Sequence, residues 1–196
     1  MRDTKLCKYP MKALILSDIH AFTTPREGGA IPSYVKVGDS DGADQQFLEY
    51  LERNSIELDL LICPGDLCDR ADATSLKHAW DFLNNVKRIT SCKCLMTTAG
   101  NHDMDSRDAS NSFDPAGFLR SLKPTFPTQI DTDCAVIQDD FHRSLWFWAR
   151  HYYIFSNDEI RCVVLNSAAY HGYHSANKSV TQPPAQRRGS SKNRQS

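Results

Sequence analysis

The sequence lacks any long apolar run. No stretch approaches the roughly 20 consecutive apolar residues that a membrane-spanning helix needs. The apolar pair Leu6-Cys7 is followed at once by Lys8-Tyr9-Pro10, so the N-terminal residues do not form the apolar centre of a secretory signal peptide. We therefore expect a protein that is neither inserted in a membrane nor secreted.

The sequence also lacks an excess of charge and a regular pattern of cysteines. The net charge is −1 and the pI is about 6.6, which favours neither a nucleic acid nor a membrane surface as partner. The seven cysteines are an odd number, and the spacing of Cys92-Lys93-Cys94 suits neither a zinc site nor a thioredoxin-like pair. We expect buried thiols in a protein of the reducing cytoplasm.

The 196 residues correspond to one domain, since domains commonly have roughly 100–200 residues. Residues 1–11 are polar and unpatterned, and we expect a dispensable leader, with Met11 able to serve as the start. Residues 12–174 form the expected domain. Residues 175–196 contain five Lys and Arg, no Asp or Glu and almost nothing apolar, which predicts a disordered basic tail. Nucleic acid binding by this tail is the less favoured interpretation.

Short apolar runs alternate with amphipathic segments, a pattern that predicts an α/β fold. The predicted strands, each a run rich in apolar residues, are Ala13–Leu16, Leu60–Cys63, Cys94–Ala99, Ala135–Ile137, Trp146–Trp148, Tyr152–Phe155 and Cys162–Leu165. The predicted helices have one apolar face and are Ala43–Arg53, Thr74–Ile89 and Pro115–Leu122. Asp72 or Thr74 is expected to cap the second of these helices.

Two further features have competing interpretations. The aromatic residues Trp146, Phe147, Trp148, Tyr152 and Tyr153 can stack nucleic acid bases, but few basic residues are interleaved with them, which favours packing in a second sheet. His78 lies off the apolar stripe of its predicted helix, so we expect a solvated surface histidine rather than a metal ligand.

Polar side chains follow three of the predicted strands directly. Because the carboxyl ends of parallel strands meet at one edge of a sheet, we expect these side chains to converge there. In an extended chain Asp18 and His20, two residues apart, would lie on the same side. The residues that follow the three strands are Asp18 and His20, then Asp66 and Asp69, then Asn101, His102 and Asp103.

Carboxylates, an amide and imidazoles suit divalent Mn, Fe, Zn or Mg rather than a metal selected by thiolates. Asp66 has two oxygens with which to bridge two ions, and a pair of divalent ions can clamp a phosphate and activate water. His102 would then be free to protonate a leaving oxygen. Asp103 would orient the imidazole of His102 and support its protonated form.

The three groups together resemble the first three motifs of the calcineurin-like metallophosphoesterases in residue type, order and spacing. They read Asp18-x-His20, Gly65-Asp66-x-x-Asp69 and Gly100-Asn101-His102-Asp103. The resemblance implies a sandwich of two mixed sheets flanked by helices and a centre of two divalent metal ions. It implies that Asp18 and His20 bind the first ion, that Asp66 bridges both ions and that Asn101 binds the second. His102 is then the acid or phosphate-contacting histidine, and Asp69 supports the site from outside.

The sequence departs from the family further along the chain. The family places a lone histidine and a Gly-His-x-His motif downstream, and here only His171 and His174 remain, in one loop. We therefore expect a C-terminally truncated phosphoesterase that binds metal weakly and hydrolyses phosphate mono- or diesters poorly. The alternative is a non-catalytic remnant or partner-binding module with the family fold. The class of phosphoester substrate is not predicted.

Overall fold

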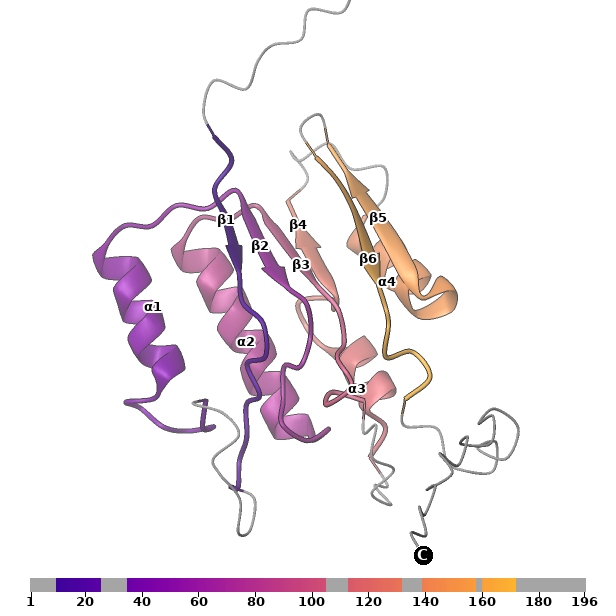
Figure 1. The fold of residues 1–196 in the computed structure, drawn as a ribbon, viewed down its shortest axis with the longest axis horizontal. Coiled ribbons are helices and arrows are strands. Elements are labelled where there is room, and N and C mark those ends of the chain that lie inside the picture. The colour runs from indigo at the N-terminus through magenta and orange to yellow at the C-terminus, as the bar shows by residue number, and fades with distance from the viewer. Residues whose placement is uncertain (1–9, 26–34, 105–112, 132–138, 158–159, 172–196) are drawn as a thin grey trace, which may run out of the picture.

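The computed structural model describes residues 10–25, 35–104, 113–131, 139–157 and 160–171. The elements in chain order are β1 (Ala13–Ile15), α1 (Ala43–Arg53), β2 (Leu60–Cys63), α2 (Ala73–Ile89), β3 (Cys94–Thr97), α3 (Pro115–Ser121), β4 (Thr128–Ile130), α4 (Asp140–Arg150), β5 (Tyr152–Ser156) and β6 (Arg161–Leu165) (Figure 1). The predicted strand Ala135–Ile137, the basic tail, His174 and all but the last two residues of the leader lie outside the described residues.

The larger sheet has the strand order β1-β2-β3-β4. The first three strands are parallel, with Ala13 beside Leu60 and Leu60 beside Cys94, and β4 is antiparallel to β3. Strands β5 and β6 form a second, antiparallel sheet. The predicted α/β fold with two sheets is therefore confirmed, and the carboxyl ends of β1, β2 and β3 lie at one edge, at the bottom of Figure 1.

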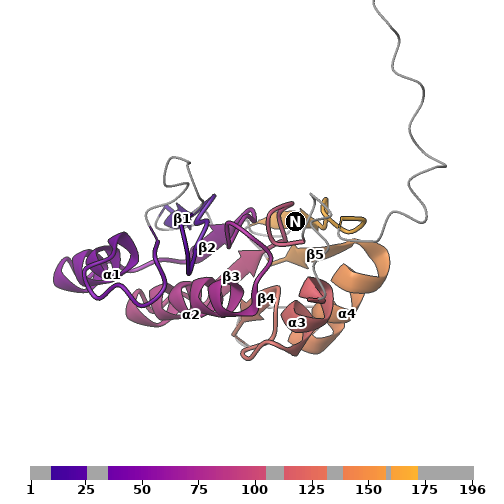
Figure 2. The same ribbon diagram turned by 90° about the horizontal axis from the view of Figure 1, so that it is seen from below.

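Helices α1 and α2 lie on one side of the parallel strands, as the view from below shows (Figure 2). Asp72, one of the two predicted caps, accepts a hydrogen bond from Ser75 N at 2.9 Å at the start of α2. The predicted apolar stripe of α2 is buried, and its members are Leu76, Ala79, Trp80, Leu83 and Val86. This burial fixes α2 against the sheet because burying each large apolar side chain stabilises the fold by about 1.5–3 kcal/mol.

His78 differs from the prediction of a solvated surface histidine. It lies on α2, and its Nε2 is 2.8 Å from a carboxylate oxygen of Asp44 on α1. Asp44 is buried, so the imidazole supplies the polar partner that a buried carboxylate needs. His78 therefore joins two helices, a contact between residues 34 positions apart that helical periodicity does not predict.

The predicted strand Trp146–Trp148 is wrong, because these residues lie within helix α4. Asp139 caps this helix by accepting a hydrogen bond from His142 N at 2.9 Å, and Phe147 lies on its buried face with Arg143 and Ser144. A run of three aromatic residues fits a strand and one side of a helix equally well. Here the capping residue Asp139 favours the helix.

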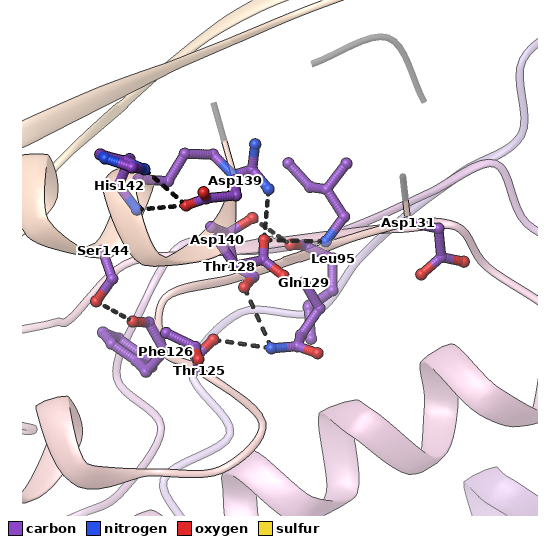
Figure 3. A network of polar contacts seen from close by, with 12 residues as sticks. Leu95, Thr125, Phe126, Thr128, Gln129, Asp131, Asp139, Asp140, His142 and Ser144 are labelled. Atoms are coloured by element: carbon purple, nitrogen blue, oxygen red, sulfur yellow. Dashed lines mark hydrogen bonds and ion pairs between the residues drawn. The ribbon is translucent and has the colours of Figure 1, made fainter. Parts of the chain in front are cut away.

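Helix α4 is attached to β4 and the loop before it by polar contacts (Figure 3). Ser144 Oγ donates to the carbonyl of Phe126 at 2.7 Å, and Asp140 accepts a hydrogen bond from Ile130 N at 3.3 Å. Phe147 and Tyr153 are fully buried and pack with ring centroids 6.2 Å apart. Packing in a second sheet, the favoured interpretation of the aromatic segment, is therefore confirmed for Tyr153 of β5, whereas Phe147 packs against it from helix α4.

The cysteines of the described residues are free thiols, and four of these five are buried. They include Cys92 and Cys94, as expected, and Cys92 Sγ donates to the carbonyl of Cys94 at 3.3 Å. Burial raises the pKa of the Cys63 thiol to about 11, so this side chain is a neutral part of the core. None of the described helices is long and apolar enough to cross a membrane.

Candidate metal centre

The chain segments that follow β1 and β2 run side by side past the ends of the strands. Leu16 N donates to the carbonyl of Ile62 at 2.9 Å, and the pairing continues beyond the sheet, where His20 N donates to the carbonyl of Asp66 at 3.0 Å. Ala21 N then donates to the carbonyl of Leu67 at 2.9 Å. These backbone hydrogen bonds place the first predicted motif directly against the second.

The loops after β2 and β3 approach each other so closely that only glycine fits at two positions. Gly65 has a φ of 115°, and a Cβ at this position would lie 2.7 Å from Gly100 N. A Cβ on Gly100 would collide with the carboxylate and the backbone nitrogen of Asp66. The close approach lets His102 N donate to Asp66 Oδ1 at 3.0 Å, which fixes the orientation of this carboxylate.

Asp18, His20 and Asp66 all have left-handed backbone conformations, with φ of 56°, 46° and 52°. The expectation that Asp18 and His20 lie in an extended chain is therefore wrong, although their side chains do come together. A non-glycine residue in this region costs roughly 1–3 kcal/mol, and such residues cluster at functional sites. Three such residues within one group of side chains indicate that the surrounding structure holds the backbone in this strained conformation.

The same three side chains form a group that fits a metal ion. One ligand atom from each of Asp18, His20 and Asp66 lies within 4.8 Å of the others. The His20 side chain is 17% exposed; its Nε2 is 3.6 Å from Asp18 Oδ1, and its buried Nδ1 has no hydrogen-bond partner among the described residues. A largely buried imidazole without a hydrogen bond is costly unless it binds a ligand, and two carboxylates beside it supply the charge that a divalent cation requires.

A second group shares His20 and consists of His20, Asp69 and His102. His102 Nδ1 is 2.9 Å from the carbonyl of Asp69 and 3.8 Å from its Oδ1, and the His102 ring lies edge-on to the His20 ring. Since a backbone carbonyl only accepts, Nδ1 carries the proton and Nε2 keeps the lone pair in the neutral ring. Asp69 therefore positions His102.

Asp103 does not orient His102 as the sequence predicts, because Asp69 makes those contacts. The Asp103 carboxylate is fully buried and accepts hydrogen bonds from Cys68 N at 2.9 Å and Gly100 N at 2.8 Å. Burial raises its pKa to about 6, and these backbone donors oppose the rise. Asp103 thus joins the loop after β2 to the loop after β3.

We expect the Asp103→Asn variant to be less stable than the original chain. The two oxygens of the Asp103 carboxylate each accept a hydrogen bond from a different backbone N–H group. The side chain of asparagine has only one oxygen, so in the variant one buried donor loses its partner at a cost of about 1–3 kcal/mol. Each kcal/mol lowers the melting temperature of a chain of this size by about 2–4 °C. Thermal unfolding followed by circular dichroism measures the shift. The control is Asp131→Asn on the exposed surface, and an equal melting temperature for both variants would refute the role of Asp103.

A cavity of about 420 Å³ opens beside the first group. Its wall includes Asp18, Asp66 and Asn101, so the structure brings these three predicted ligands to one space. The residues that sequence reasoning missed here are Ser17, Ser167 and Ala168, and it gave His171 little weight, yet His171 also lines the cavity. The available signal was the position of His171 in the loop that follows the predicted strand Cys162–Leu165, although it lies six residues beyond that strand.

The carboxyl ends of three parallel strands thus bring together acidic and histidine side chains that fit a divalent metal ion. The family model for calcineurin-like phosphoesterases matches residues 11–183, and the chain belongs to this family of metal-dependent hydrolases that act on phosphoester bonds. No curated protein matches the sequence.

Proposed function

We propose that this chain hydrolyses phosphate mono- or diesters with divalent metal ions held by Asp18, His20, Asp66 and Asn101. The observation that carries the proposal is the convergence of Asp18, His20 and Asp66, with ligand atoms within 4.8 Å of one another, beside a cavity of about 420 Å³ whose wall includes Asp18 and Asp66. That volume lies within the range of roughly 300–1,000 Å³ that is usual for small-molecule sites.

The four ligands divide unequally between two ions. Asp18, His20 and Asp66 would hold the first ion, while Asp66 and Asn101 would hold the second, so among the described residues the second ion has one shared carboxylate and one neutral amide. When bound, such ions polarise the phosphoryl group and activate a water molecule for attack. We therefore expect the first ion to bind more tightly than the second.

His102 is the candidate general acid. Asp69 takes the hydrogen bond of Nδ1, so the ring is held in one orientation, and in the protonated imidazolium Nε2 can give its proton to the leaving oxygen. Proton transfer by a positioned side chain contributes typically about 10²–10⁴-fold to the rate. In this proposal the carboxylates bind and orient, and the proton moves at Nε2 of His102.

The test measures hydrolysis of an aryl phosphomonoester and an aryl phosphodiester by the 196-residue chain, with Mn²⁺, Zn²⁺, Mg²⁺ and Fe²⁺ supplied separately. We expect release of the aryl alcohol with at least one metal and its loss when a chelator is added. The control is the Asp81→Asn variant, since Asp81 pairs with Lys77 on the surface of α2. Metal binding without hydrolysis of either ester would favour a non-catalytic, partner-binding member of the family instead.

A further inference from the structure

We propose that His171 is a substrate-binding residue that donates a hydrogen bond to a phosphoryl oxygen of the bound ester. The inference rests on the function proposed above, and it assigns a role to a cavity residue that is not among the candidate metal ligands. The observation behind it is that His171 lines the same cavity as Asp18, Asp66 and Asn101 but comes from the turn after β6, in the second sheet.

The turn that carries His171 is fixed to the strand that leads into the metal centre. Thr98 Oγ1 donates to the carbonyl of Leu165 at 2.6 Å, and Thr98 lies between β3 and Asn101. Strand β6 therefore ends at the same edge of the molecule as β1 and β2, as Figure 1 shows. This contact sets the place of the turn relative to the candidate ligands.

The turn itself is held by backbone hydrogen bonds and by burial. Asn166 N donates to the carbonyl of His151 at 2.8 Å, and His171 N donates to the carbonyl of Ala168 at 3.0 Å. Ala168 and Ala169 are buried, at 1% and 7% exposure. His171 is thus held on the cavity wall by a structured turn, with its side chain only partly exposed.

A contact with substrate explains the position of His171 better than a contact with metal. The groups of potential metal ligands among the described residues contain His20, Asp66 and others but do not contain His171. An ester held by ions at Asp18, Asp66 and Asn101 would lie in the same cavity as the His171 imidazole. An imidazole always keeps at least one N–H, so His171 can donate to such an oxygen in either protonation state.

The experiment measures two affinities by calorimetry, that of Mn²⁺ for the metal-free protein and that of inorganic phosphate for the Mn²⁺-loaded protein. We expect His171→Ala to weaken phosphate binding by about 10–100-fold, the range for one hydrogen bond to a charged group, and to leave Mn²⁺ affinity unchanged. With an aryl phosphate as substrate, KM should rise in the same variant. His142→Ala, on the exposed side of α4, is the matched histidine control, and His171→Asn, which keeps an N–H donor, should recover part of the phosphate affinity.

Three results would overturn the inference. If His171→Ala lowers Mn²⁺ affinity as well, His171 acts on the metal rather than on the substrate. If phosphate affinity is unchanged in both folded His171 variants while the original chain binds Mn²⁺ and phosphate, only the inference about His171 fails. If the original chain binds neither Mn²⁺ nor phosphate, the proposed function fails and this inference fails with it.

Discussion

The Asp66→Asn variant should lose both metal binding and phosphoester hydrolysis while it remains folded. Asp66 takes part in three features of the site: it belongs to the candidate metal group, accepts a hydrogen bond from His102 N and lines the cavity. Asparagine keeps the shape and one accepting oxygen but removes the negative charge that, in the proposed function, two ions would share. The variant therefore separates the electrostatic role of Asp66 from its role in holding the loop.

The expected loss of Mn²⁺ affinity exceeds the roughly 10–100-fold that follows from removing a partner outside the first ligand sphere. Hydrolysis should fall to the level seen without metal. Calorimetry with Mn²⁺ and an aryl phosphate assay measure the two effects, with Asp81→Asn as the surface control. Retention of Mn²⁺ affinity within a few-fold of the original value would contradict the assignment of Asp66 as a ligand.

The His102→Asn variant provides the contrasting result. His102 contacts Asp69 through its ring and is assigned to proton transfer rather than to the ions. Its replacement should leave Mn²⁺ affinity nearly unchanged and reduce turnover by about 10²–10⁴-fold. A loss of Mn²⁺ affinity equal to that of Asp66→Asn would show instead that the group of His20, Asp69 and His102 holds the metal.

The Gly100→Ala variant should have the second largest effect, because a single methyl group displaces Asp66. The new Cβ would overlap the Asp66 carboxylate and its backbone nitrogen, and backbone atoms have little freedom to move away. Either the carboxylate leaves the metal group or the loops separate and Gly100 N loses its bond to Asp103. Both routes lower Mn²⁺ affinity and the melting temperature together.

Gly38→Ala is the matched control for this variant. Gly38 has a φ of 80°, so alanine is strained there as well, but its Cβ would meet nothing within 4 Å and the position does not line the metal cavity. We expect a lower melting temperature with unchanged Mn²⁺ affinity for Gly38→Ala, and a loss of both for Gly100→Ala. Equal Mn²⁺ affinity in the two variants would refute the steric argument.

Much of the fold follows from local patterns in the sequence. Helix α1 has the predicted bounds, and the buried stripe of α2 follows from spacing alone, because each depends on the period of one helix. The sequence does not predict strand β4, because Thr128–Ile130 is short, has no apolar run and forms a strand by pairing with β3. The prediction of a strand at Trp146–Trp148 is wrong because a short apolar run does not distinguish a strand from a buried helix face.

The sequence predicts the types of residue that form the candidate site, but it predicts their contacts less well. The ends of β1, β2 and β3 bring Asp18, Asp66 and Asn101 to one cavity, as parallel strands require. The left-handed backbone at Asp18 and the partners of Asp103 arise from packing between loops, which no local pattern encodes. His171 reaches the cavity through the second sheet, so only the tertiary structure shows its place.

The central claim is that Asp18, His20 and Asp66 together bind a divalent metal ion. A crystal structure of the chain grown with Mn²⁺, with anomalous diffraction recorded at the manganese edge, tests this claim most directly. We predict an anomalous peak in contact with Asp18, His20 and Asp66, and a weaker peak between Asp66 and Asn101. A peak bounded by His20, Asp69 and His102, or no peak at this edge of the sheet, would contradict the claim.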